Sequence, residues 1–298
     1  GIQIINNTEL KLTSCVFQNC TCAVTLHYNI YMPVIVSIAE TRFQNSACRR
    51  SSGILSIYFK NAKLVDGDSI HRSVMVKLIF SELAITNCTC GAFSVFRDVI
   101  YESHNNFADK IIIQNSLFAY NTLCFKSEII EFIANIDHIF INNSSFLGNF
   151  GDAYVDTGIN LKVMNCIFDG NVINSYAAGL QVVLIRYPVI YNSTFIGNYA
   201  KKDGGSLFIY KARVMHLISS NFVRNRIDNL GAGVFVLKTP TVHMTNCKAV
   251  QNTGAKHGGA FYIAEAHNVI LRNCVFQQNS AKERGGGIYL MTTLGFKY

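Results

Sequence analysis

One short motif recurs along this chain at a near-constant spacing. Its form is Asn-(Cys/Ser)-x-Phe-x-x-Asn, and from residue 168 onward its Phe position recurs every 27 residues. Intact copies begin at Asn115, Asn143, Asn165, Asn192 and Asn273. Variants begin at Ser219 and at Asn246, the second with Ala249 in the Phe position. A fixed period of this length is typical of repeat architectures, in which each unit packs against its neighbours.

A second element begins nine residues after the Phe position, where a glycine turn enters a short alternating apolar run. Its copies are Gly204-Gly-Ser-Leu-Phe-Ile, Gly231-Ala-Gly-Val-Phe-Val, Gly258-Gly-Ala-Phe-Tyr-Ile and Gly285-Gly-Gly-Ile-Tyr-Leu. A third short strand precedes the first Asn, as at Val269 to Arg272. Strands this short and close leave no room for helical crossovers, so each circuit must pair with the next. The sequence therefore predicts an all-β, right-handed, single-stranded parallel β-helix, a solenoid of about 10–11 coils of ~27 residues.

The period of two along a strand assigns a place to each motif residue. Cys274 and Phe276 point inward and Val275 points outward, so we expect successive Phe residues to form an aromatic stack. We expect both Asn residues of the motif at corners, where Asn tolerates a positive φ. Cysteines two residues before the Phe position alternate with Ser and Thr, as small buried side chains would. We interpret five cysteines in this way: Cys15, Cys88, Cys166, Cys247 and Cys274. Cys247 and Cys274 in adjacent coils could be bonded, because the coil spacing is within disulfide range, but we favour stacked free thiols.

The pattern decays toward the N-terminus. We interpret residues 1–298 as a single β-helix domain, with irregular coils over 1–110 and regular coils over 111–298. Asn87-Cys-Thr-Cys looks like a motif copy with Cys90 in the Phe place. Between residues 46 and 86 we expect one poorly matched coil or an insertion around Lys63 to Arg72. The chain lacks an initiator Met and a signal peptide, so we expect a fragment of a longer protein with further domains.

The composition excludes several classes of protein. Half of the residues are hydrophobic and 15% are charged, which is too apolar for a disordered chain. No stretch approaches the roughly 18 consecutive apolar residues of a membrane span. The net charge of +8 contains no Lys/Arg block, so we expect no nucleic-acid partner. We also expect no cofactor.

The alternation of Phe-x-x-Asn with Gly-Gly-Ala-Φ, where Φ is apolar, resembles the repeats of the polymorphic outer membrane proteins. These belong to the pectin-lyase-like β-helix class. The Phe residues that head intact Phe-x-x-Asn motifs are Phe118, Phe146, Phe168, Phe195, Phe222 and Phe276, and Gly258 begins the best copy of the second motif. The resemblance covers about residues 110 to 298. It implies a secreted, extracellular or cell-surface module with a role in adhesion.

Enzymes are the competing class, because β-helices also include polysaccharide lyases and hydrolases. Such enzymes place two or three carboxylates side by side for acid–base chemistry or Ca²⁺ binding. Asp and Glu total 18 here and recur at no fixed repeat position. The nearest pairs are Asp66 with Asp68 and Asp152 with Asp156, which we interpret as solvated loop carboxylates. We therefore expect no catalytic residue.

Cys22 and Cys48 differ from the inward cysteines. Each lies five residues after a Phe, so stacking places them on neighbouring corner loops, as a candidate disulfide in a secreted protein. The Cys-x-Cys pairs at Cys20 and Cys88 lack ordered histidine partners, so we expect no metal site. Six sequons provide glycosylation candidates, although the repeat motif itself creates a sequon when its third residue is Ser or Thr. They are Asn6, Asn19, Asn87, Asn142, Asn143 and Asn192.

A set of cations follows the second Asn in the C-terminal coils. They fall six to eight residues after the Phe position, so stacking aligns them as a basic edge about 15 Å long. They are Lys201, Lys202, Lys256, Lys282 and Arg284. This edge could attract an anionic glycan or a cell-surface protein. Asp203, Asp228 and Glu283 interrupt it, which leaves an ordinary solvated edge as the alternative.

We favour a non-catalytic extracellular or cell-surface module that serves in adhesion or in glycan or protein binding. A structural spacer of a large surface protein and a polysaccharide-active lyase or hydrolase are the alternatives. Outward aromatic residues recur at one offset in four coils, and we expect loops or a partner to half-bury them. They are Phe208, Phe235, Tyr262 and Tyr289.

Overall fold

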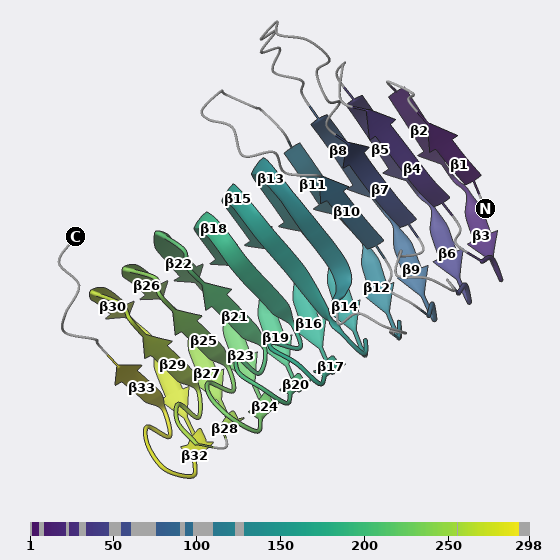
Figure 1. Cartoon of the computed structure of the whole chain (residues 1–298). Helices are drawn as coiled ribbons and strands as arrows, with labels where there is room; N and C mark the ends of the chain where they lie inside the picture. The colour runs from purple at the N-terminus through teal and green to yellow at the C-terminus, as the bar shows by residue number, and fades with distance from the viewer. Residues whose placement is uncertain are drawn as a thin grey trace, which may run out of the picture.

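The chain forms a parallel β-solenoid whose coils stack from the N-terminal to the C-terminal end (Figure 1). The computed structural model describes residues 2–5, 9–21, 24–29, 34–47, 55–60, 76–89, 93–97, 110–122, 128–254 and 256–291. Three sheets surround one main hydrophobic core, which confirms the expected all-β solenoid. None of the described segments is a helix that could cross a bilayer.

The Phe motif builds a ten-stranded sheet with one strand in each coil. Its strands are β3 (Val16–Gln18), β6 (Arg42–Gln44), β9 (Ala84–Thr86), β12 (Leu117–Ala119), β14 (Ser145–Leu147), β16 (Ile167–Asp169), β19 (Thr194–Ile196), β23 (Asn221–Val223), β27 (Lys248–Val250) and β31 (Val275–Gln277). The strands pair in parallel with the Phe positions in register. Ten strands agree with the expected 10–11 coils.

A wide sheet of 18 strands contains two strand rows per coil. The first row holds β1 (Ile2–Ile5), β4 (Val24–Asn29), β7 (Leu55–Lys60), β10 (Phe93–Arg97), β21 (Leu207–Tyr210), β25 (Val234–Leu237), β29 (Phe261–Ala264) and β33 (Ile288–Met291). The second holds β2 (Glu9–Thr13), β5 (Val34–Ala39), β8 (Val76–Ser81), β11 (Lys110–Gln114), β22 (Val214–Ile218), β26 (Thr241–Thr245) and β30 (Asn268–Arg272). Three long strands run through both rows: β13 (Glu128–Asn142), β15 (Asp152–Met164) and β18 (Leu180–Tyr191).

A third sheet of five two-residue strands lies between the Phe sheet and the glycine turns of the regular coils. Its strands are β17 (Val172–Ile173), β20 (Tyr199–Ala200), β24 (Arg226–Ile227), β28 (Thr253–Gly254) and β32 (Ser280–Ala281). The glycine turn that follows needs a residue without a Cβ. At Gly258 the φ is +69° and a Cβ would lie 2.6 Å from the Phe261 carbonyl oxygen.

The first Asn of the motif is at a corner with positive φ, as expected; the value is 51° at Asn273 and 44° at Asn192. The second Asn of the motif does not have a positive φ. The residue before it takes the positive φ instead, as at Gly197 with 59°, and the Asn itself is buried. The prediction that both Asn residues provide left-handed corners was therefore wrong for the second one. That residue has a different structural role.

The second Asn forms a buried hydrogen-bonded ladder along the solenoid axis. The Nδ2 of Asn198 donates to Oδ1 of Asn225 at 3.0 Å and to the Phe168 carbonyl at 2.9 Å. Its Oδ1 accepts from the backbone N and from Nδ2 of Asn171 at 3.1 and 3.0 Å. Each buried polar atom thus finds its partner in an adjacent coil. The ladder contains Asn121, Asn149, Asn171, Asn198, Asn225, Asn252 and Asn279.

The inward Phe residues stack as expected. The rings of Phe146, Phe168 and Phe195 follow one another at 4.6 Å with interplanar angles of 5° and 4°. The column changes where Ala249 replaces Phe. Phe261, from the first row of the wide sheet, lies edge-on between Phe222 and Phe276 at 5.5 and 5.0 Å. A bulky residue from one sheet therefore fills the space that the other sheet leaves.

The motif copy at Asn87 to Cys90 is shifted from the predicted register. Ile85 pairs with Phe43 and Phe118, so Ile85 and not Cys90 occupies the Phe place; Cys90 lies outside the described residues. The backbone N of Cys88 donates to Oδ1 of Asn121, which places Cys88 in the ladder position rather than two before Phe. Phe43 and Ile85 are 42 residues apart, and residues 61–75, with the expected insertion at Lys63 to Arg72, lie outside the described residues.

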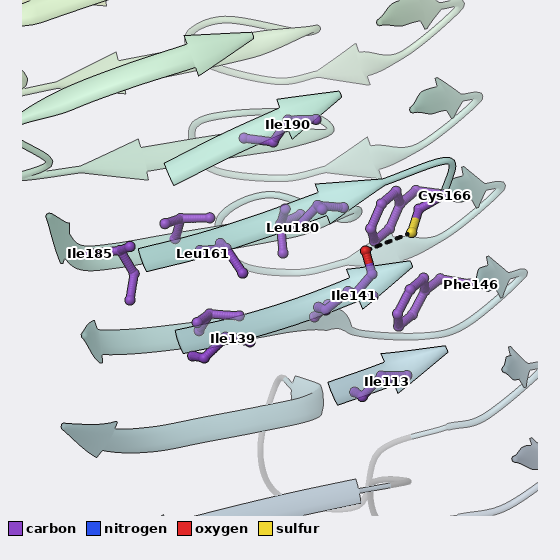
Figure 2. Close-up of a cluster of buried hydrophobic side chains, with 14 of the residues drawn as sticks. Ile113, Ile139, Ile141, Phe146, Leu161, Cys166, Leu180, Ile185 and Ile190 are labelled. Atoms are coloured by element: carbon purple, nitrogen blue, oxygen red, sulfur yellow. Dashed lines mark hydrogen bonds between the residues drawn. The ribbon is translucent and has the colours of Figure 1, made fainter. Parts of the chain in front are cut away.

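The other inward cysteines are where the motif predicts. The Sγ of Cys166 lies 3.5 Å from the Ile141 carbonyl in the preceding coil, the coil that also contains Phe146 (Figure 2). Its backbone N donates to Oγ of Ser193, the equivalent residue of the next coil. Cys247 and Cys274 are free thiols in adjacent coils, and Cys15 is also free. A small side chain with a weak donor explains the exchange of Cys and Ser at this position.

The buried thiols should resist alkylation in the folded protein. Burial raises the pKa of Cys166 to about 11, and burial followed by the neighbouring Cys274 raises the pKa of Cys247 to about 11. At pH 8 only about one thiol in a thousand is then the reactive thiolate. We expect iodoacetamide to label neither residue until urea is added, as read by peptide mass spectrometry. Rapid labelling of Cys166 in native protein would contradict this, and the half-buried Cys15 provides the comparison.

Candidate binding edges of the solenoid

The predicted basic edge lies on the loop between the third sheet and the glycine turn, and all five of its cations are exposed. Backbone hydrogen bonds fix the alignment of its coils. Lys256 N donates to the Asn229 carbonyl at 3.0 Å, and Glu283 N donates to the Lys256 carbonyl at 3.0 Å. One column therefore contains Lys256 next to Glu283 rather than cations alone. The predicted alignment is present, with carboxylates inside it.

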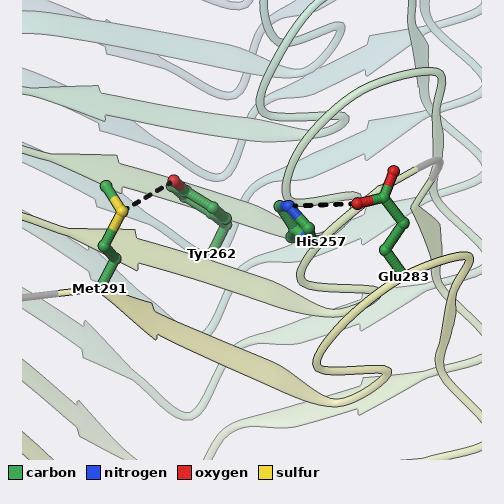
Figure 3. A network of polar contacts seen from close by, with 4 residues as sticks. All are labelled: His257, Tyr262, Glu283 and Met291. Atoms are coloured by element: carbon green, nitrogen blue, oxygen red, sulfur yellow. Dashed lines mark hydrogen bonds and ion pairs between the residues drawn. The ribbon is translucent and has the colours of Figure 1, made fainter.

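Each interrupting carboxylate has its own partner on this edge. Asp203 accepts a 2.7 Å hydrogen bond from Nδ2 of Asn229, and burial raises its pKa despite that bond and two nearby lysines. Asp228 accepts a 2.8 Å hydrogen bond from the Tyr199 hydroxyl, which raises the pKa of Tyr199. Glu283 lies 3.6 Å from Nε2 of His257 (Figure 3). The carboxylates lower the net positive charge of the predicted edge.

The outward aromatic row anchors this loop. Phe208, Phe235 and Tyr262 are 8%, 4% and 6% exposed, so these three are buried more deeply than the expected half, whereas Tyr289 is half-buried. Their rings stack at 5.1 and 5.0 Å, and Tyr289 continues the stack at 5.3 Å. The chain's own loop residues, including Leu230, complete this small second core. The row supports the loop, and its coverage comes from the chain itself.

A second set of cations lies at the bend between the two rows of the wide sheet. We call it the bend patch; it consists of Arg186, Lys211, Arg213 and Lys238, all exposed. The bend is tight, with φ of 57° at Lys211 and 55° at Lys238. Lys211 N donates to the Leu237 carbonyl and Lys238 N to the Ala264 carbonyl, so the two lysines occupy the same position of adjacent coils.

Aromatic residues lie directly beside the bend patch. The Nζ atoms of Lys211 and Lys238 are 5.2 and 5.9 Å from the centroid of the same Tyr210 ring. Nη1 of Arg213 donates to the Tyr187 hydroxyl at 3.4 Å. Like charges on adjacent coils, roughly 5 Å apart at the backbone, repel by on the order of 1 kcal/mol in water. The bend patch is therefore a local concentration of positive charge.

Sequence reasoning missed the bend patch. The signal was present, because Lys211 and Lys238 are 27 residues apart, as are Arg186 and Arg213. The bend itself was hidden, since it joins two apolar strands that the sequence does not separate. Equivalent residues in the preceding coils include Leu184, at a φ of 55° and 44% exposed, within the continuous strand β18.

A histidine pair lies on the outer face of the second row. His216 and His243 are register partners on β22 and β26, and their rings stack at 4.9 Å. Val189 and Ile270 flank them in the same column. Burial, followed by the charge of His243, lowers the pKa of His216. The folded chain thus favours the neutral imidazole at this position.

His216 should make the protein less stable in acid. The unfolded chain binds a proton at His216 near pH 6.5, whereas the folded chain resists it. Neutral His216 therefore contributes its full stability above the pKa of the unfolded chain. This contribution is lost as the pH falls through and below that pKa. We expect His216→Gln to lose less of its melting temperature than wild type between pH 8 and pH 5. His267→Gln, at an exposed histidine, should follow wild type. Parallel curves for all three proteins would refute the assignment.

Four of the glycosylation candidates lie at corners of the Phe sheet: Asn19, Asn87, Asn143 and Asn192. Asn19 and Asn87 are exposed with φ of 53° and 52°. Exposed amides also bond along the axis, with Nδ2 of Asn192 2.8 Å from Oδ1 of Asn165. Asn143 and Asn142 take part in similar bonds, and Asn6 lies outside the described residues. Glycosylation stays a prediction.

The remaining sequence candidates lie elsewhere. Cys22 and Cys48 of the expected disulfide, and Asp66 and Asp68, lie outside the described residues. The interpretation of Asp152 as a solvated loop residue was wrong, because it is buried at the start of β15. Asp156 lies within the same strand and accepts hydrogen bonds from Tyr154 and Thr157 at 2.9 and 2.8 Å. In the described part of the chain no group of three or more His, Cys, Asp or Glu could hold a metal ion.

Comparison with known proteins gives one match. A family model described as a right-handed beta helix region matches residues 132–296, more than half of the chain. This adds the handedness to the solenoid described above. No curated protein and no solved structure matches the chain.

Proposed function

The chain belongs to the family of right-handed β-helix regions, and from that premise we propose that it is a non-catalytic extracellular or cell-surface module that binds polyanions. The ligand class we favour is an anionic glycan, with an acidic cell-surface protein as the alternative. The Phe-x-x-Asn and Gly-Gly-Ala-Φ repeats support a place among the polymorphic outer membrane protein repeats as the finer part of this proposal.

The observation that carries the proposal is the periodic display of exposed cations on the turns of a fixed scaffold. Lys211 and Lys238 recur at one position of the bend in adjacent coils, and Arg186 and Arg213 recur at a second position of the same bend. Hydrogen bonds between coils hold the backbone at both positions. Repeated charges at a fixed spacing suit a linear ligand with repeated charges of opposite sign.

The contacts of three carboxylates support a non-catalytic role. The repeated Asn, Cys and Phe residues stabilise the coils through buried hydrogen bonds and packing. Asp156, Asp228 and Glu283 each interact with a different partner: Tyr154, Tyr199 and His257. Carboxylates bound separately in this way do not form the adjacent pair that glycoside hydrolysis uses.

Binding and turnover can be measured on the same protein. We expect retention on immobilised heparin at 20–50 mM salt, with elution as the salt rises, because exposed charges are screened. We also expect no unsaturated product and no new reducing ends from polygalacturonate. Product formation would favour the lyase or hydrolase alternative. Absence of binding to every anionic glycan and acidic protein tested would favour the structural spacer.

A further inference from the structure

We propose that the bend patch is the binding site and that its ligand is a linear sulfated polysaccharide. This inference rests on the proposed function and names both the site and the ligand chemistry. The bend patch has four exposed cations in three consecutive coils: Arg186, Lys211, Arg213 and Lys238. A chain that follows the solenoid axis can contact all of them.

The charge balance distinguishes the bend patch from the predicted edge. At the predicted edge, Asp203, Asp228 and Glu283 alternate with the cations and bind neighbouring side chains. At the bend, Glu265 is the carboxylate in the column of Lys211 and Lys238, one coil further on. Among the described residues, no ion pair involves any of the four patch cations. Their charge is available to a ligand.

The bend also fixes the cations in place. The left-handed backbone at Lys211 and Lys238, bonded to the next coil, leaves only side-chain rotation to relieve their repulsion. Both ammonium groups nevertheless converge on the Tyr210 ring, a cation–π arrangement that keeps them together. An oxyanion placed between the two ammonium groups offsets their repulsion and is attracted by both positive charges.

Several features favour a sulfated chain over other polyanions. The bend patch is a narrow strip along the bend, roughly 10 Å long over three coils. This shape fits a linear chain better than a flat bilayer. The guanidinium groups of Arg186 and Arg213 present forked donors that match tetrahedral oxyanions. Single-stranded nucleic acid would need an open ring face for stacking, whereas two ammonium groups already lie over Tyr210.

The test compares two double charge reversals with the same change in net charge. Lys211→Glu with Lys238→Glu alters the bend patch, and Lys201→Glu with Lys202→Glu alters the predicted edge. Binding of a heparin-derived octasaccharide is measured by calorimetry at 50 mM NaCl, with thermal melts confirming that each variant is folded. We expect a loss of roughly tenfold or more for the bend variant and less than about threefold for the edge variant. Arg213→Lys keeps the charge and loses the fork, so it should weaken binding by about threefold.

The remaining outcomes separate the two levels of the proposal. Equal effects of the two reversals, or a larger effect at the edge, would place the site away from the bend and leave the proposed function standing. Equal affinity for the fully desulfated octasaccharide, or tighter binding of single-stranded DNA, would overturn the ligand class. Absence of binding of every polyanion to wild type would overturn the proposed function and this inference together.

Discussion

Replacing Asn198 by aspartate should lower the free energy of unfolding by about 3–5 kcal/mol. The side chain is fully buried. Its Oδ1 can still accept from Asn171 after the change, but the two Nδ2 donors are lost. In their place a carboxylate oxygen would face Oδ1 of Asn225 and the Phe168 carbonyl. Oδ1 of Asn225 would keep only its bond from the Asn198 backbone N. Both acceptors would face a buried negative charge, which is among the costliest single changes in a protein core.

Urea unfolding followed by circular dichroism measures this loss. Asn192→Asp is the matched control, because it makes the same chemical change in the same coil at an exposed corner. That control should change the free energy of unfolding by less than about 0.5 kcal/mol. If both variants lose the same small amount of unfolding free energy, the Asn ladder does not stabilise the solenoid.

The second large effect concerns the exchange of bulk between Ala249 and Phe261. Phe261→Val leaves a cavity between Phe222 and Phe276, and we expect a loss of about 2–4 kcal/mol. Ala249→Phe alone places a ring where Phe261 already lies, at a cost of about 1–3 kcal/mol or more. Together they restore the arrangement of the preceding coil, where Val234 is the register partner of Phe261. The double variant should lie within about 1 kcal/mol of wild type.

This pair is tested as a double-mutant cycle. The expected coupling energy is roughly 3 kcal/mol or more, with a sign that favours the double variant. The converse exchange, Phe222→Ala with Val234→Phe, should show coupling of the same sign in the preceding coil. Additive losses in both cycles would mean that the two sheets do not share one packing site.

The coil could be predicted from the sequence because its residues obey strict local rules. Phe168, Phe195 and Phe222 recur every 27 residues and all prove fully buried. The register of the motif copy at Asn87 could not be predicted, because Asn is favoured at the corners on both sides of the Phe strand. Asn87 has a φ of 52°, like the first Asn of other copies, yet it precedes the ladder position. A left-handed corner selects for Asn at either place.

The candidate site was predicted only in part. The spacing placed Lys202 and Lys256 on one edge correctly, since that loop follows the recognisable Asn. The hydrogen bond from Asn229 to Asp203 depends on side-chain directions that no spacing gives. The bend patch needed the structure, because strand β18 crosses the bend position without a break whereas β21 and β22 are separate strands. The sequence of an apolar run does not show where it bends.

We propose that function lies in residues that vary between the repeats, whereas the repeated residues build the fold. The most direct test is a map of backbone amide chemical shifts during titration with the sulfated octasaccharide. We expect the largest changes at residues 184–187, 211–213 and 238–240, with few changes in the Phe sheet and its Asn ladder. Largest changes centred on the Phe sheet or on the outer face of the second row around His216 would contradict the account.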